Sequence, residues 1–144
     1  MSHAIGARRR AREVAFRVAY QADVAGDAYR AAWELRRESE ERLSPDQLEL
    51  IDDVVGALET SAPRVDEELQ SALEDRWVIA RLAATDRAVL RVAVAELLSR
   101  PGSPARVVLD EAIDIARTYG SEESGRFVNG VLDRAARRLR PAEF

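Results

Sequence analysis

The sequence has no cysteine, no lysine and a single histidine, His3. Without cysteine, disulfides and thiolate metal sites are excluded, and the composition fits a reducing compartment. No apolar run approaches the roughly 20 residues of a membrane span, and the N-terminus lacks the apolar core of a signal peptide, so we expect a cytoplasmic protein without membrane contacts. One histidine near the chain end excludes a Ser–His or Cys–His pair in a fixed core. Because phosphate-binding glycine loops and dinucleotide fingerprints are also missing, we expect no enzyme.

The charges are strongly segregated along the chain. All 22 basic residues are arginine, and they face 26 acidic residues for a net charge of −4. Residues 1–20 and residues 126–140 each carry a net charge of +4, whereas residues 21–125 hold 12 Arg against 23 acids. If the two basic ends meet in space, they form a basic face on an acidic protein. The exclusive use of arginine fits genomic codon bias, or alternatively a need for planar groups that bind phosphate and stack on bases.

Apolar residues recur with helical spacing over nearly the whole chain, and no stretch alternates as a strand does. The 144 residues, 47% of them apolar, therefore predict one all-α domain of about seven short-looped helices. The predicted boundaries are Gly26 after the first helix, a capping box from Ser44, an amphipathic segment over 65–77, a break at 82–87 with Thr85 or Asp86 as the next cap, and Ser121 as the last cap. Residues 86–98 are apolar on nearly every side, which predicts the central buried helix. The acidic runs indicate solvated helix faces, with no metal site.

Two features favour nucleic-acid binding. The first is a cluster of four arginines in five positions at the start of a helix: Arg8, Arg9, Arg10 and Arg12. Cations oppose the helix dipole at that end, whereas bound phosphate would neutralise their mutual repulsion. The second is Phe127, on the flank of an apolar stripe and next to Arg126 and Asn129; an aromatic beside cations is typical of single-stranded RNA sites. A solvated face and a core phenylalanine are the alternative interpretations.

Gly125 and Gly130 interrupt the last helix, where each costs about 1 kcal/mol relative to alanine. We predict that Gly130 lets this helix press against the 86–98 helix. Gly125 is predicted to leave the first turn bare beside Phe127, so that a ribose or phosphate can approach the backbone.

Three stretches together resemble a known family. They are "ARRRARE" at 7–13, "TDRAVLRVAVAELL" at 85–98 and "VVLDEAIDIARTYGSEESGRFVNGVLD" at 107–133. In order and spacing they resemble the NusB family of bacterial transcription antitermination factors. The resemblance covers nearly the whole chain, and over 27–76 only the helical pattern supports it. Ala95 and Asp110 depart from the family pattern, which often has an aromatic and an asparagine at these positions.

The resemblance implies a compact NusB-like bundle in two packed halves, approximately 1–75 and 76–144, without catalysis and without a cofactor. It implies binding of boxA-type single-stranded RNA, as in ribosomal RNA operon leaders, together with NusE, a protein of the small ribosomal subunit. The pair is expected to join other Nus factors on RNA polymerase and to suppress premature termination. Whether the chain pairs with itself as a homodimer is left open, as is the preferred RNA sequence.

The resemblance also assigns site residues one by one. It places Arg8, Arg9, Arg10 and Arg12 on the RNA-facing surface, with Phe127 as an aromatic contact, Asn129 as a further candidate, and Glu123 as an acid near the RNA. It places Tyr20 and Asp86 toward NusE, with a buried tyrosine and a helix cap as alternative interpretations.

Two other functions compete with this one. The same fold precedes ribosomal RNA cytosine methyltransferases, so the chain could be the RNA-binding domain of such an enzyme, although "RPAEF" follows directly on the last predicted helix. A helical protein-interaction module that binds no RNA is the third interpretation.

Overall fold

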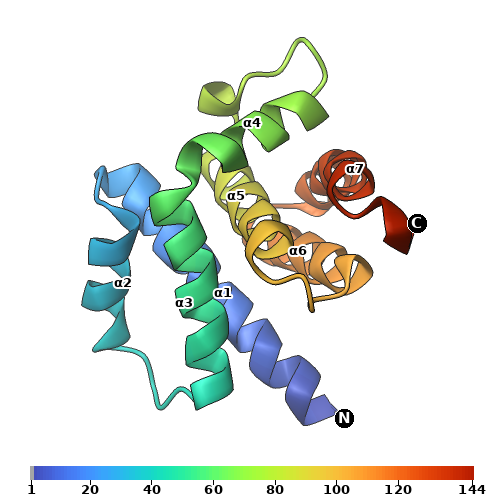
Figure 1. Cartoon of the computed structure of the whole chain (residues 1–144). Helices are drawn as coiled ribbons and strands as arrows, with labels where there is room; N and C mark the ends of the chain where they lie inside the picture. Colours follow the sequence, from blue (N-terminus) through green and yellow to red (C-terminus); the bar gives the residue numbers. More distant parts are fainter. Residues whose placement is uncertain (1) are drawn as a thin grey trace.

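The computed structural model describes residues 2–144, with side chains from residue 6 onward, so the side chain of His3 lies outside the described part. The elements follow in the order α1 (Ser2–Ala25), α2 (Tyr29–Arg37), α3 (Pro45–Thr60), α4 (Ala62–Ala72), the 3-10 turn η1 (Ile79–Arg81), α5 (Ala84–Ser99), α6 (Ala105–Tyr119), α7 (Glu122–Leu139) and the 3-10 turn η2 (Pro141–Glu143). The prediction of an all-α fold with about seven helices is confirmed (Figure 1). No helix within residues 2–144 has the length and apolar character needed to cross a membrane.

Three of the predicted helix boundaries are confirmed by their local hydrogen bonds. Gly26 has φ +76, and the following amide of Asp27 donates to the carbonyl of Ala22 at 3.0 Å, which closes α1. The capping box of α3 is complete, because Ser44 Oγ accepts from the Gln47 amide and the Gln47 side chain accepts from the Ser44 amide. Ser121 Oγ accepts from the Ser124 amide at 3.1 Å and caps α7.

The predicted cap of α5 is wrong. The N-cap position is Ala83, which makes no side-chain capping bond, and Thr85 and Asp86 both lie inside the first turn. Asp86 nevertheless stands at the positive end of the helix dipole, where a carboxylate is favourable. The acid therefore stabilises the helix start by its charge and not as a hydrogen-bonding cap.

The connection between α4 and α5 also differs from the prediction of an amphipathic helix over 65–77. Helix α4 ends at Ala72, and Trp77 lies in the loop that follows. Arg87 of α5 holds this loop in place, because its guanidinium donates to the carbonyl oxygens of Ile79, Ala80 and Leu82 at 3.2, 3.3 and 2.8 Å. A side chain from later in the chain thus fixes the loop, and the local spacing of apolar residues does not reveal this.

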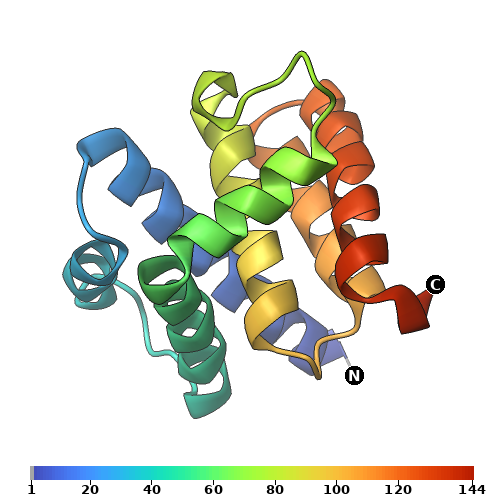
Figure 2. The same cartoon turned by 45° about the horizontal axis from the view of Figure 1, so that its top comes forward.

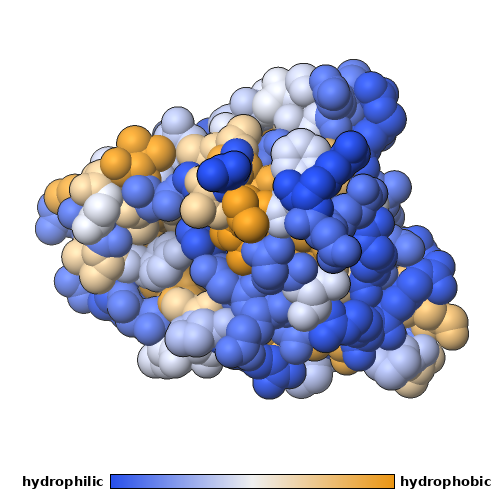
Figure 3. Space-filling model, turned by 90° about the horizontal axis from the view of Figure 1, so that it is seen from above, coloured by the Kyte–Doolittle hydropathy of each residue, from blue (hydrophilic) through white to orange (hydrophobic). Residues whose placement is uncertain are grey.

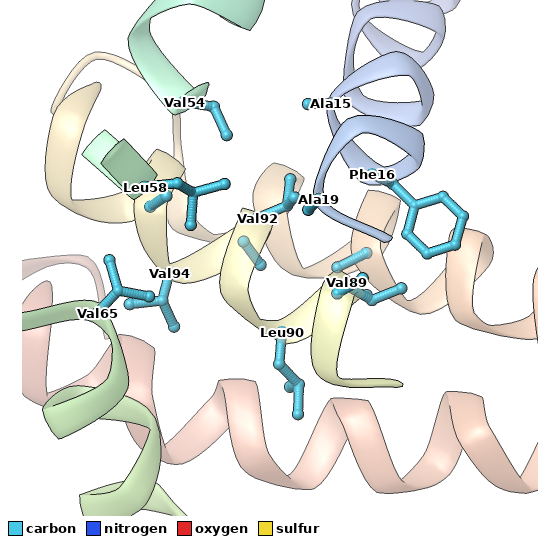
Figure 4. Packing of buried hydrophobic residues seen from close by; sticks show 14 of the residues in the cluster. Ala15, Phe16, Ala19, Val54, Leu58, Val65, Val89, Leu90, Val92 and Val94 are labelled. Carbon is cyan, nitrogen blue, oxygen red and sulfur yellow. The ribbon is translucent and has the colours of Figure 1, made fainter. Parts of the chain in front are cut away.

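Helix α5 lies at the centre of the bundle and packs against α1, α3, α4, α6 and α7 (Figures 1 and 2). Its apolar side chains point in several directions: Leu90 points toward α7 and Val94 toward Val65 of α4 (Figure 4). Nine of its residues are buried, and Ala95, one of the departures from the family pattern, is among them. The prediction that 86–98 forms the most enclosed helix is confirmed in this sense, because an all-round apolar surface must be covered on every side.

The two basic ends of the chain lie toward the same side of the molecule in both views (Figures 1 and 2). Helix α6 packs against α1 on one flank and against α7 on the other, so it separates the N-terminal arginines from the last helix. Helix α4 packs against α5 and α7 as well as α3. The division into halves near residue 75 stays a prediction.

Candidate functional site

The arginines of the N-terminal cluster do not form one free basic patch, because most of them meet acidic groups of other helices, and Arg9 and Arg12 both contact Glu111. Arg8 is half exposed and lies 3.4 Å from Asp46 at the start of α3. Arg9 binds Glu111 and also Asp114 of α6, the latter at 2.6 Å. The Arg10 guanidinium donates to two backbone carbonyl oxygens in the loop before α3, at 3.0 and 3.1 Å. Successive residues of a helix differ by about 100°, so Arg8 and Arg10 reach the start of α3 and the loop before it, whereas Arg9 and Arg12 turn toward α6 and α5.

Arg12 is buried and does not face solvent. Its guanidinium makes a bidentate pair with Glu96 of α5, at 2.8 and 2.7 Å, and only 5% of the side chain is exposed. Ser103 Oγ donates to the same carboxylate at 2.8 Å. The prediction that Arg12 faces RNA is therefore wrong for this conformation, because the guanidinium is fully engaged between α1 and α5. The isolated Glu96 within the apolar 86–98 stretch was the signal in the sequence that a buried cation was required.

Arg9 remains a firmly charged group although it is partly covered. Burial lowers the pKa of its guanidinium, but the hydrogen bonds and charges of Glu111 and Asp114 outweigh this and raise the pKa above its usual value. Asp114 continues the chain of charges to Arg117, 3.6 Å away. Of the four predicted cations, Arg8, Arg9 and Arg10 thus keep part of their surface accessible.

Phe127 lines a groove of about 320 Å³ where α7 begins, which we call the aromatic groove. Its ring stands edge-on to that of Trp77, with centroids 5.5 Å apart and an angle of 60° between the planes. The full lining consists of Trp77, Arg81, Leu82, Ala83, Asp86, Ser121, Glu123, Ser124 and Phe127. Phe127 is half-buried and packs on the core, so it is a core residue with an accessible side, and its contact with RNA stays a prediction.

Charged groups of both signs lie around the two rings of the aromatic groove. Glu123 is exposed at the rim, as its predicted place near a ligand requires. Asp86 has one carboxylate oxygen, Oδ1, that is buried without a hydrogen-bond partner in the described part of the chain. Arg81 also lines this groove. Sequence reasoning missed Trp77 and Arg81, since the four-residue spacing assigned Trp77 to a helix face.

A second groove of about 530 Å³, which we call the apolar groove, lies beside the C-terminal half of α1. It is lined by Phe16, Arg17, Tyr20, Gln21, Val24, Ala25, Arg36, Thr85 and Tyr119. Tyr20 is 40% exposed and Val24 is 62% exposed. Figure 3, seen from the side where η1 lies, shows hydrophobic surface as separate patches within a mostly hydrophilic face.

The wall of the apolar groove is fixed by Tyr119. Its ring packs 4.8 Å from the ring of Phe16 and lies under the guanidinium of Arg17, 5.5 Å away. The hydroxyl donates to Glu13 at 2.9 Å. Burial raises the pKa of Tyr119, and the bond to the Glu13 carboxylate raises it further, so the phenol stays protonated and keeps this bond near neutral pH.

The predicted partner-facing residues do not share one hollow. Tyr20 lines the apolar groove, while Asp86 lines the aromatic groove together with Phe127 and Glu123. Thr85, the neighbour of Asp86, lines the apolar groove, so the first turn of α5 forms part of both. Asn129 is exposed on the outside of α7 and lines neither groove.

Both predictions about the glycines of α7 are wrong. A Cβ atom on Gly125 would lie 2.7 Å from Cγ of Arg117, so this glycine lets the Arg117 side chain cross the first turn of α7 and does not leave the backbone open. A Cβ atom on Gly130 would meet only the Arg134 guanidinium, at an ordinary 3.7 Å. Among the described residues no neighbouring helix comes within 4 Å of this Cβ position, so close packing is the role of Gly125 instead.

Comparison with known proteins places this geometry in a family. The model of the NusB family matches residues 9–137. The chain is 42% identical over 135 residues to the transcription antitermination protein NusB of Anaeromyxobacter dehalogenans, with 94% of each chain covered. It is 40% identical over 136 residues to that of Sorangium cellulosum, covering 94% of this chain and 95% of the relative.

Solved structures agree with this. A crystal form of NusB from T. maritima has a TM-score of 0.84 at 34% identity, and 94% of each chain is covered. A crystal structure of the antitermination factors NusB and NusE in complex with double-stranded RNA has a TM-score of 0.76 at 27% identity, and covers 92% of this chain and 97% of the other. The matched order of helices, the shared fold and the length of the sequence match lead to one conclusion. This chain belongs to the NusB family.

Proposed function

We propose that this protein is a transcription antitermination factor that binds RNA together with NusE and carries no catalytic activity. Its relatives are named transcription antitermination proteins, and the NusB–NusE–RNA structure has the same fold. The RNA is single-stranded and of the boxA type that the family resemblance implies. The complex joins other Nus factors on RNA polymerase in the cytoplasm and suppresses premature termination.

The observation that carries this proposal is the aromatic groove. Single-stranded RNA is bound by aromatic rings on which bases stack, by cations that bind phosphate, and by polar groups that bind base edges. Phe127 and Trp77 supply the rings, Arg81 supplies a cation, and Glu123 and Asp86 supply acceptors for the N–H groups of a base. Arg8, Arg9 and Arg10 contribute long-range attraction for the phosphates from the first helix.

The apolar groove is the surface proposed for NusE. Interfaces between proteins are typically apolar at the centre and contain exposed aromatic residues. Tyr20 and Val24 supply such a surface, and Arg17 and Arg36 give it a polar rim. Because the first turn of α5 lines both grooves, NusE bound at the apolar groove lies next to the RNA and can contact it.

The proposal is tested by fluorescence anisotropy with a boxA RNA and a scrambled RNA, each with and without NusE. We expect NusE to tighten boxA binding and to leave the scrambled RNA unchanged. Phe127→Ala should weaken boxA binding about tenfold, as expected for the loss of one stacked base. Val107→Ala is the control, since it removes an exposed apolar side chain from α6 outside both grooves.

The proposal fails if NusE does not change the affinity for boxA RNA. Equal weakening of boxA and scrambled RNA by Phe127→Ala would remove this ring from sequence recognition. Tyr20→Ala should abolish the effect of NusE and leave RNA binding by the isolated protein in place.

A further inference from the structure

The solvent face of α7 carries a stripe of residues of which only Phe127 lines one of the two grooves. At about 100° per residue, Phe127, Gly130 and Arg134 lie close together on the helix surface. Arg126 and Arg137 lie next to Gly130, on the side away from Phe127, so that all five positions fall within about 100° of the helix circumference. Arg126 and Arg134 are exposed, and the Arg137 side chain is 57% exposed. The stripe therefore combines one aromatic, three cations and a position without a side chain, and the exposed Glu123, one turn before Phe127, falls in the same sector.

Gly130 lies in the middle of this stripe without a packing role. Within the part of the chain that the structure describes, the only atom that a Cβ there would approach is Nη1 of Arg134, at 3.7 Å. Glycine in the interior of a helix lowers helix stability, and here no neighbouring element requires it. A bare backbone on an accessible helix face allows a ligand to approach closely. The fold leaves the glycine unexplained, and a ligand explains it.

Arg134 is held beside Gly130 in a fixed orientation. Its Nε donates to the carbonyl oxygen of Ala72 at the end of α4, at 2.6 Å. Within the described residues no carboxylate forms an ion pair with Arg134, and the same is true of Arg126. The two terminal nitrogens of Arg134 are left for another partner, and a planar fork of this kind matches the oxygens of a phosphate.

The stripe ends at a second aromatic residue. The ring of Phe144 is 39% exposed and contacts two guanidiniums, those of Arg106 at 5.3 Å and Arg137 at 4.9 Å. Arg137 also pairs with Asp133 at 3.0 Å, which neutralises part of its charge. Rings that lie beside cations are suited to stacked bases next to phosphates. An aromatic ring beside cations thus lies at both ends of this face of α7, and Gly130 and Arg134 lie between them.

We propose that the α7 face, defined by Arg126, Phe127, Gly130, Arg134, Arg137 and Phe144, binds the sugar–phosphate backbone of single-stranded RNA that flanks the segment bound in the aromatic groove. This rests on the proposed function, since it extends an RNA path that starts at Phe127. The contacts are independent of base sequence, because they go to phosphates and to the faces of bases. The face adds affinity and salt dependence for longer RNA and adds no sequence preference.

The test compares a short boxA RNA with the same RNA extended on either side by about six nucleotides of random sequence. Affinities of the full-length protein are measured over a range of salt concentrations. For the wild type, the extension should tighten binding about fivefold and steepen the salt dependence. In Arg134→Gln/Arg137→Gln, the gain in affinity from the extension should disappear. The negative slope of log K against log salt for the long RNA should become shallower by about 1.4, because each of the two lost phosphate contacts contributes about 0.7 for a single strand.

Controls separate this proposal from the proposed function and from misfolding. Arg30→Gln/Arg64→Gln removes the same charge from half-exposed arginines of α2 and α4 and should keep the gain. Gly130→Ala should retain or raise the melting temperature and still weaken the long RNA. Affinity for the short RNA should stay within twofold of wild type in every variant, so its loss would count against the proposed function and not against the α7 face.

Three results would overturn the proposal. One is no gain from the extension in the wild type. Another is an unchanged gain in Arg134→Gln/Arg137→Gln, or an equal loss in the Arg30/Arg64 control. The third is a gain from the extension in the wild type that leaves the salt dependence unchanged, because contacts with phosphates must steepen it.

Discussion

The buried pair between Arg12 and Glu96 gives the sharpest test of how this fold is held together. Arg12→Met leaves the Glu96 carboxylate, whose side chain is 1% exposed, without its cation. Glu96→Leu removes the bidentate partner of the buried Arg12 guanidinium and leaves it only the 3.5 Å contact with Glu111. Breaking a buried pair from one side typically costs about 3–5 kcal/mol, because an uncompensated charge stays in a low-dielectric environment. For a domain of this size, such a loss lowers the melting temperature by roughly 10–15 °C.

The double variant Arg12→Met/Glu96→Leu should recover most of this loss. It removes both charges and leaves apolar side chains of similar length between α1 and α5, and such replacements are often neutral. Two smaller costs remain. Ser103 Oγ loses the acceptor that it binds at 2.8 Å, which is worth about 1 kcal/mol, and Glu111 loses a contact of 3.5 Å with Arg12. We expect the double variant within about 2 kcal/mol of wild type.

Denaturant unfolding of the four proteins gives the coupling energy, and RNA anisotropy on the folded double variant gives the functional result. A coupling of about 2 kcal/mol or more, together with unchanged RNA affinity, fits a structural arginine. Strictly additive losses would show that the two groups do not stabilise each other. If stability recovered while boxA affinity fell tenfold, Arg12 would contact RNA after all, and its buried position would not describe the bound state.

Three further predictions concern other parts of the molecule. Ser44→Ala should lower the free energy of unfolding by about 1 kcal/mol in urea titrations, because it breaks the capping box of α3, whereas Ser44→Asp should cost much less. The pKa of Glu143 is lowered from 4.5 by the hydrogen bond from the Ala105 amide and by the nearby Arg140. The stability that this carboxylate adds is therefore present above pH 4.5 and is lost as the pH falls through the lowered pKa. Glu143→Gln should flatten this acid dependence in a pH series of melting temperatures, and an unchanged series would contradict the prediction. Arg87→Ala should speed amide hydrogen exchange in residues 73–83 much more than in α3, because it removes three hydrogen bonds to carbonyl oxygens of this loop.

The order and type of the helices could be predicted from the sequence because each is fixed by local features. The capping box at Ser44, the glycine at 26 and the serine at 121 act within one or two turns of their own helix. The burial of 86–98 followed from an apolar surface on all sides, which only a central position can cover. These signals do not depend on the rest of the chain.

The site could be predicted only in part, because its geometry depends on contacts between distant residues. The arginine cluster looked like one basic patch, but Arg12 meets Glu96 across 84 positions of sequence and Arg9 meets Glu111 across 102. Trp77 reaches the ring of Phe127 from a loop that Arg87 of a later helix holds in place. The pattern along one helix cannot show which acid from another helix neutralises a given arginine.

The five-sided contact of α5 has a consequence for how the protein comes apart. Separation of α1, α3, α4, α6 or α7 uncovers part of the buried surface of this helix, so none of these five helices can melt without opening the core that they share. The amides in the middle of α5 can then exchange only through global unfolding, and their protection equals the stability of the whole molecule. A ligand that binds at the first turn of α5 therefore stabilises this helix and the five helices packed on it together, and its affinity can be measured from the unfolding of any one of them.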